Sequence, residues 1–249
     1  MSIQIAASAT GPTNQLAIPP LQGDGNPPPP PLENGDRLNR IEFERRWDAM
    51  PHVKKAELIE GVVYMASPVG HAKHGEPHSE AIGWLALYRY ATPGVKGGAE
   101  SSIRLDLENM PQPDAFLYIP QSLGGRIRID EDDYVIGTPE LVVEVASSSA
   151  SYDLHAKLRV YQRNGTPEYV VWRTRDKAVD WFILREGRYE RLAPGPDGIL
   201  RSEVFPGLWL DPDALMRDDR AAMLRVNQLG TTSAEHSAFV TRLNPKPSA

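Results

Sequence analysis

The stretch Pro139-Glu140-Leu141-Val142-Val143-Glu144-Val145 decides the fold of this chain. Consecutive leucine and valine residues are typical of a strand that is buried on both faces of a sheet. The serine-rich run 147–151 follows, which is suited to capping a helix over about 151–164 that stops at Asn164-Gly165. A second apolar strand is expected at 168–172. A strand, a helix and a further strand in this order predict a sheet with helices between its strands.

Outward from this unit, hydrophobic spacing predicts the remaining elements. They are a helix near 39–47, a hairpin over 56–65 that turns at Glu60-Gly61, a helix over 76–91, strands near 100–105 and 114–119, and a hairpin over 178–192. We therefore expect an α/β (or α+β) protein in which helices flank a mixed sheet. The single domain is expected over 36–216. A proline-rich tail over 1–35 is expected to be disordered, and 217–249 to be helical and then flexible.

Composition narrows the class of protein. The chain has 249 residues and no cysteine, which excludes disulfides, thiolate metal sites and cysteine nucleophiles. No apolar run approaches the roughly 18–20 residues of a membrane helix, and the first residues lack a secretory signal. We expect a cytoplasmic protein with no membrane partner. The net charge of -6 argues against a dedicated DNA-binding module.

Two carboxylates stand out against their apolar surroundings. Glu144 lies inside the valine-rich strand, where an ionised group is unfavourable unless a cation pairs with it. Asp114 opens another apolar run directly after Gln112-Pro113, which favours an extended strand start. Two acids that converge on one cation are the basis of a magnesium-dependent phosphodiesterase site. The alternatives are a turn residue for Asp114, and for Glu144 a buried pair with an arginine or lysine.

Two further residues are candidates for the same site. Glu60 lies at the predicted hairpin turn, where a solvated turn glutamate is the alternative. Lys157 lies on the helix after Glu144 and could supply a cation. Its alternative is a surface pair with Asp153 at i,i+4 spacing, worth a few tenths of a kcal/mol.

At this point the ordered motifs resemble a known family. They are Glu57-Leu58-Ile59-Glu60-Gly61, Gln112-Pro113-Asp114, the stretch 139–145, Asp153-Leu154-His155-Ala156-Lys157, Tyr161 and the strand 167–172. This set is similar to the Uma-two family of endonucleases, in the PD-(D/E)xK or restriction-endonuclease-like superfamily. The resemblance covers about residues 40–215. It implies a central mixed β-sheet flanked by helices.

The resemblance also implies a divalent-metal site. Pro113-Asp114 matches the "PD" pair, Glu144 the "D/E", and Glu60 the upstream acid. Ala146 stands where the superfamily has lysine, and Lys157 matches the lysine that this family carries on the following helix. Asp114, Glu144 and the Val145 carbonyl are then expected to hold Mg²⁺ or Mn²⁺. This arrangement requires the Asp153–Lys157 face of the helix to point at the end of the sheet.

These expectations give a leading hypothesis and a rival. The first is a metal-dependent endonuclease that acts on DNA. A homodimer is a further hypothesis, because cleavage of both strands would need two active centres. The rival is a catalytically silent module that keeps the nuclease fold and binds nucleic acid or protein, which the acidic charge and Ala146 favour. His71, His74 and His78 invite a metal interpretation, but Gly75 and Pro77 are expected to interrupt a helix through them. His78 is expected near a helix start, where it could line the active cleft.

Overall fold

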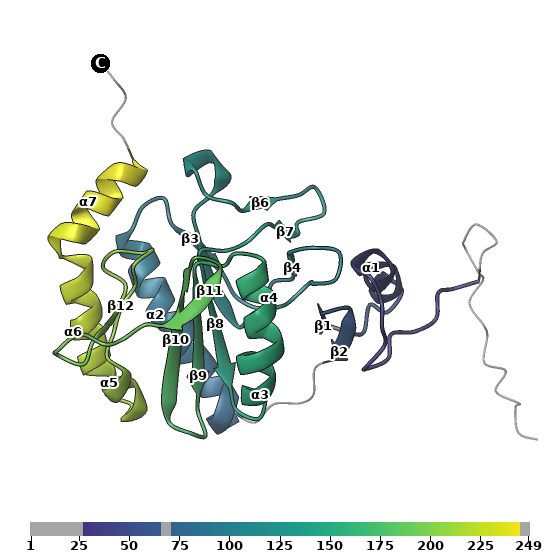
Figure 1. Cartoon of the computed structure of the whole chain (residues 1–249), viewed down its shortest axis with the longest axis horizontal. Helices are drawn as coiled ribbons and strands as arrows, with labels where there is room; N and C mark the ends of the chain where they lie inside the picture. Colours follow the sequence, from purple (N-terminus) through teal and green to yellow (C-terminus); the bar gives the residue numbers. More distant parts are fainter. Residues whose placement is uncertain (1–26, 66–70, 245–249) are drawn as a thin grey trace, which may run out of the picture.

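The computed structural model describes residues 27–65 and 71–244. Its centre is a six-stranded sheet in the order β11-β10-β9-β8-β5-β3 (Figure 1). The strands are β3 (Lys96–Gly98), β5 (Ala115–Tyr118), β8 (Leu141–Ala146), β9 (Glu168–Arg173), β10 (Ala178–Arg185) and β11 (Arg188–Arg191). β8 and β9 run parallel and the other neighbours antiparallel, so the expected mixed sheet is confirmed.

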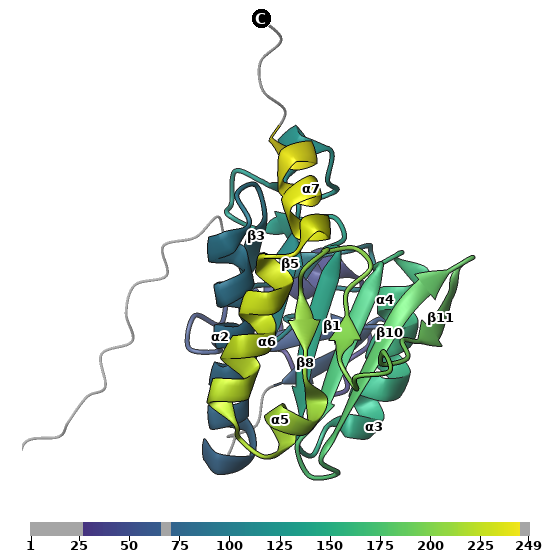
Figure 2. The same ribbon diagram turned by 90° about the vertical axis from the view of Figure 1, so that its left-hand side faces the viewer.

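The central strand β8 is buried along its whole length because helices cover both faces of the sheet. Val143 and Val145 pack in the same core as α2 (Glu76–Ala91), whereas Val142 packs in the core with Tyr161 of α4 (Leu158–Arg163). Figure 2 shows the strands between α2 on one side and α3 (Ala150–Tyr152) with α4 on the other. The α/β class with flanking helices is therefore confirmed.

A strand–helix–strand unit links β8 to β9. Between them lie α3, a π-helical segment η3 (Asp153–Lys157) and α4. The chain leaves α4 at Gly165, whose φ of 75° is a left-handed conformation that glycine adopts without strain. The glycine stop thus ends this helix close to the predicted limit, whereas at its start the Ser149 side chain makes no capping hydrogen bond.

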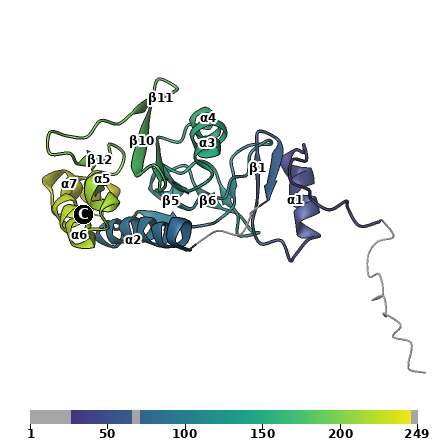
Figure 3. The same cartoon turned by 90° about the horizontal axis from the view of Figure 1, so that it is seen from below.

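A smaller layer covers one end of the sheet. It consists of α1 (Arg40–Asp48) and the hairpin β1 (Ala56–Ile59) and β2 (Val62–Met65), which turns at Glu60-Gly61 as predicted. Figure 3 shows this layer at the opposite end of the molecule from the C-terminal helices. Part of the expected tail contacts this layer, since Leu32 is buried in its core and the Gly35 N–H donates to Val63 O. Residues 1–26 lie outside the described residues.

Short elements complete the fold. They are η1 (His71–Gly75), η2 (Gln121–Leu123), β4 (Ile103–Arg104), β6 (Arg128–Ile129), β7 (Val135–Ile136), β12 (Leu200–Arg201), β13 (Trp209–Leu210), α5 (Pro212–Met216), α6 (Arg220–Thr231) and α7 (Ala234–Leu243). Phe239 and Leu243 of α7 lie in the same core as Tyr88 and Phe205, so the C-terminal helices pack on the domain. In the described part of the chain, no helix combines the length and apolarity needed to cross a membrane.

Candidate active site

Lys157 occupies the centre of a buried cluster of carboxylates. Its side chain is only 5 % exposed, and its Nζ lies 2.9 Å from Glu144 Oε1 and 2.9 Å from Glu57 Oε1. Asp153 Oδ1 lies 3.9 Å from the same nitrogen. The η3 face that carries Asp153 and Lys157 therefore points at the end of the sheet, as the resemblance required. Lys157 thus makes buried ion pairs rather than a surface pair.

Lys157 reaches Glu144 from the following helical segment, and not from the position two residues after Glu144. Ala146 ends β8, is buried, and has no functional side chain to offer. The ammonium group of Lys157 instead reaches Glu144 from η3, the π-helical segment between α3 and α4. Such segments are rare and are frequent at functional sites.

Asp114 lies beside Glu144 because β5 and β8 are antiparallel, with Ala115 opposite Val143. Its Oδ2 accepts a hydrogen bond of 2.7 Å from the Val145 N–H, which fixes the carboxylate against the central strand. Its Oδ1 faces a more open region, 3.7 Å from Lys55 Nζ. Asp114 is thus oriented by the backbone of β8 rather than by a turn.

Electrostatics in this cluster are dominated by burial and by the like charge of the acids. Burial and the nearby carboxylates of Asp114, Asp153 and Glu57 raise the pKa of Glu144 well above its usual value, although Lys157 opposes this. Burial alone would lower the pKa of Lys157, but Glu144 and Glu57 outweigh it and hold that pKa well above the usual value. Lys157 therefore stays protonated at neutral pH.

The upstream acid at this site is Glu57, and Glu60 lies elsewhere. Glu57 Oε1 accepts a 2.7 Å hydrogen bond from the Gln112 N–H as well as contacting Lys157. Glu60 lies at the hairpin turn, where its carboxylate pairs with Arg159 at 2.8 Å and Arg163 at 3.5 Å. The structure thus does not bring Glu60 together with Asp114, Glu144 and Lys157.

A sequence signal for Glu57 was present. It is an acid inside the apolar run Ala56-Glu57-Leu58-Ile59, the same pattern that singled out Glu144. All four residues of this strand are buried. The turn position of Glu60, by contrast, is typical of a solvated side chain.

Two histidines contact the backbone of this site. His74 Nδ1 donates to the Val145 carbonyl at 3.0 Å, and His78 Nε2 donates to the Asp114 carbonyl at 2.9 Å. The expectation that Gly75 and Pro77 interrupt the helix is wrong, because η1 continues directly into α2. Proline is tolerated in the first turn of a helix, where its missing N–H has no partner to lose.

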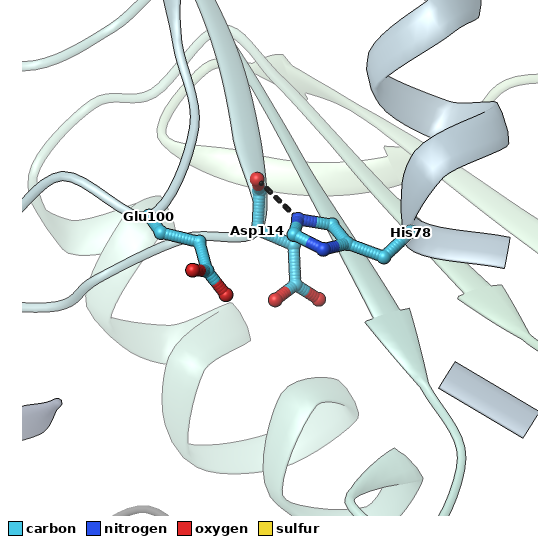
Figure 4. Close-up of side chains that lie close together, drawn as sticks. All are labelled: His78, Glu100 and Asp114. Carbon is cyan, nitrogen blue, oxygen red and sulfur yellow. Dashed lines mark hydrogen bonds between the residues drawn. The ribbon is translucent and has the colours of Figure 1, made fainter. Parts of the chain in front are cut away.

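His78, Glu100 and Asp114 each offer a ligand atom within 4.8 Å of the others. Figure 4 shows the two carboxylates directed at a common space beside the His78 ring. Glu100 was not expected as a site residue, because the sequence placed it at the start of a strand; in the structure it precedes β4, is exposed and has a φ of 49°. His71, the first of the three histidines, is exposed.

The donor chemistry fits a hard divalent cation. In the described part of the chain, the buried acids at the site are Glu57, Asp114, Glu144 and Asp153, and Lys157 is the buried cation among them. Burial lowers the pKa of neighbouring Lys55, but Asp114 and Glu100 outweigh it, so that this lysine is also charged. The carboxyl groups at the site still outnumber the two ammonium groups. Carboxylate and carbonyl oxygens are the ligands that Mg²⁺ and Mn²⁺ prefer.

A mixed sheet flanked by helices, with acids and a lysine gathered at the edge where β8 ends, defines a restriction-endonuclease-like fold. A solved structure agrees: the crystal structure of "a putative nuclease belonging to DUF820 from Anabaena variabilis ATCC 29413". It is similar to this chain with a TM-score of 0.53 and 17% sequence identity, over 69% of this chain and 96% of that chain. At this identity the similarity shows the fold.

The family follows from the sequence match. Residues 41–213 match the family model described as "Uma2: Putative restriction endonuclease", and the chain belongs to this Uma2 (Uma-two) family. The comparison with curated proteins gives no match. The family and the fold together support a nuclease-like function, that of a hydrolase acting on nucleic acid.

Proposed function

We propose that this protein is an endonuclease that uses Mg²⁺ or Mn²⁺ to hydrolyse phosphodiester bonds of DNA. The observation that carries the proposal is the buried position of Lys157 between Glu144 and Glu57, with Asp114 beside Glu144. A cluster of buried acids with one lysine is costly for folding, so it needs a functional reason or a compensating cation.

Asp114, Glu144 and the Val145 carbonyl are the groups that would hold the cation. Lys157 and Tyr161 both donate to Oε1 of Glu144. Neither of these two bonds uses Oε2, so Oε2 would be the oxygen that binds the cation. Oδ1 of Asp114 lies beyond hydrogen-bond distance of Lys55 and His74, at 3.7 and 3.8 Å. When bound, the metal ion would lower the pKa of a water ligand and neutralise charge on the phosphate.

The residues of the chain have separate roles around that centre. The carboxylates of Glu144 and Glu57 raise the pKa of Lys157 above its usual value, and the N–H groups of this ammonium would stabilise negative charge that develops on the phosphate. Glu57 holds the ammonium group in place through its 2.9 Å ion pair. The half-buried Lys55 is 3.4 Å from Glu100 and 3.7 Å from Asp114, where it can contact a phosphate oxygen.

The direct test is cleavage of single- and double-stranded DNA and RNA with Mg²⁺ or Mn²⁺. The wild type should cleave DNA, and Asp114→Asn and Glu144→Gln should each lose activity by at least about a thousandfold. Circular dichroism must show that both variants are folded. The proposal fails if the wild type cleaves no faster than the Asp114→Asn, Glu144→Gln double variant.

A matched pair of variants separates the two upstream acids. Glu57→Gln should lose most of the cleavage activity because Lys157 loses one of its two close partners. Glu60→Gln should stay within a few-fold of wild type because its partners are the surface residues Arg159 and Arg163. Equal losses in both variants would contradict this assignment.

The rival function is a silent module that keeps the fold to bind nucleic acid or protein. It is favoured by Ala146, which replaces the superfamily's lysine, and by the acidic charge of -6. Calorimetry with Mn²⁺ distinguishes the two: no binding tighter than millimolar, together with unchanged folding of Glu144→Gln, supports the silent module. A homodimer, which would pair two centres for cleavage of both strands, is tested by sedimentation.

A further inference from the structure

A cavity of about 250 Å³ lies between α2 and the edge of the sheet formed by β3 and β5. No motif in the sequence pointed to it. Its walls are largely apolar and come from both sides, with Ile82, Leu85 and Arg89 on α2 and Gly97, Ala99 and Ala115 on the strand side.

The cavity adjoins the candidate metal ligands. Ala99 directly precedes Glu100 and Ala115 directly follows Asp114 in the chain, although successive side chains of an extended strand point to opposite faces. On α2, the lining begins at Ile82, one turn (about 6 Å) beyond His78, whose ring donates to the Asp114 carbonyl. A group bound at this end of the cavity would therefore lie on the α2 side of the candidate metal ligands.

Glycine keeps the strand wall open. A Cβ built on Gly97 would lie 2.8 Å from Phe116 O and 3.0 Å from Leu117 Cδ2, and at 3.8 Å it would be in van der Waals contact with Arg89 Cδ. A side chain at this position would therefore displace β5 or enter the cavity. The close approach of β3 to β5 and the open space beside α2 both depend on glycine here.

Arg89 gives the cavity its polar group. It forms no salt bridge with any carboxylate of the described residues, whereas Arg220, on the neighbouring groove between α2 and α6, pairs with Glu76 and Glu80. The Arg89 guanidinium carbon lies 5.3 Å from the Tyr90 ring. A guanidinium with free donors at an apolar wall fits a ligand that has apolar faces and hydrogen-bond acceptors at its edge.

We propose that this cavity receives a nucleobase from the nucleotide beside the scissile phosphate. A base offers flat apolar faces to Ile82 and Leu85 and acceptor atoms to Arg89. It can enter only when it is unstacked and unpaired, so the preferred substrate is single-stranded at this position. This inference rests on the proposed nuclease function, because it places the base next to the phosphate that a metal ion at Asp114 would hold.

The test compares binding of two short fluorescein-labelled strands in Ca²⁺, a hard cation that takes oxygen ligands: oligothymidine, and a strand of the same length that consists of abasic sites. The wild type should bind oligothymidine about tenfold more tightly, since the phosphates are identical and only the bases differ. Arg89→Met and Ile82→Trp should lose this preference. Lys96→Met removes an exposed charge from β3 without touching the cavity, so it should weaken both strands equally and keep the preference.

Two outcomes overturn the inference: equal binding of both strands by the wild type, or an unchanged preference in folded Arg89→Met. A duplex of the same sequence should bind more weakly than the single strand, and tighter duplex binding also contradicts it. DNA cleavage is measured separately from binding. A wild type that prefers oligothymidine but never cleaves DNA refutes the nuclease function. An Arg89→Met variant that cleaves DNA and keeps the full preference for oligothymidine refutes only the assignment of the base to this cavity.

Discussion

Lys157 shows how one residue can connect segments that are far apart in sequence. Its ammonium group contacts Glu57 of the hairpin and Glu144 of the central strand. Each contact offsets a desolvation penalty that would otherwise destabilise the fold, because buried charges are tolerated only when they are paired. The same pairing raises the pKa of the lysine and keeps it protonated.

Removal of this cation should therefore be costly. Lys157→Met is expected to lower the free energy of unfolding by about 3–5 kcal/mol, since it leaves Glu144 and Glu57 buried without their partner. Adding Glu144→Gln should recover part of that loss. Urea denaturation followed by circular dichroism measures both, and strictly additive effects of the two substitutions would contradict a direct ion pair.

The acids at the site also show the limit of residue-level reasoning. Asp114, Glu144 and Lys157 could be proposed from sequence because each departs from an apolar pattern or completes a motif. Glu57 and Glu60 lie three positions apart, and residues at that spacing in a strand point to opposite faces. Which of the two meets Lys157 depends on how the hairpin packs on the sheet, and no local pattern encodes that.

At the scale of elements, β9 is fixed to the loop after β12 by one buried carboxylate. Glu168 Oε1 accepts the N–H groups of Glu203 and Val204, and its Oε2 accepts the Ser202 hydroxyl and the Trp181 indole N–H. Burial is the largest influence and raises the pKa of Glu168 to about 7, although these hydrogen bonds oppose it. The carboxyl group thus titrates near neutral pH.

This pKa predicts a pH-dependent stability. The pKa of Glu168 is higher in the folded state than its ordinary 4.5, so its contribution is complete below about 4.5 and is lost as the pH rises through about 7. The free energy of unfolding of wild type relative to Glu168→Gln should fall over this range by on the order of 3 kcal/mol. Urea denaturation at stepped pH values measures it.

The control for that experiment is Glu190→Gln. The Glu190 side chain is 63% exposed on β11, so its substitution should leave the pH dependence of the wild type unchanged. A constant difference between wild type and Glu168→Gln from pH 4.5 to 8 would show that Glu168 does not titrate there.

At the scale of the whole molecule, the C-terminal helices complete the core. The sequence placed the end of the domain near residue 216, but Phe239 of α7 packs edge-on against Phe205, with ring centroids 6.2 Å apart. His236 Nε2 lies 2.9 Å from the Thr92 hydroxyl at the end of α2. Residues 220–243 therefore support the helix that carries His78.

Two substitutions in these helices test that role. Phe239→Ala should lower the free energy of unfolding by about 3–5 kcal/mol, because it opens a cavity in the main core. Leu229→Ala, at a position 62 % exposed on α6, should change it by less than about 0.5 kcal/mol. Thermal and urea unfolding give both values. A small effect of Phe239→Ala would mean that the C-terminal helices are dispensable.

The sequence by itself determined the buried strand β8, the helix that follows it, the hairpin turn at Glu60-Gly61 and the order of acids and lysine. These features follow from hydrophobic periodicity, turn residues and ordered motifs, which act over a few neighbouring residues. They were enough to predict a mixed sheet flanked by helices and, among the residues proposed for the site, Asp114, Glu144, Val145 and Lys157, but not Glu57 or Lys55.

Only the tertiary structure decided that Glu57 meets Lys157, that His74 and His78 hold the backbone of β8 and β5, and that a cavity opens beside Glu100. The physical reason is that these contacts join the hairpin, α2, the sheet edge and η3, and their geometry is set by how those elements pack. A one-dimensional pattern records which side chains an element presents, but not which distant element lies opposite them.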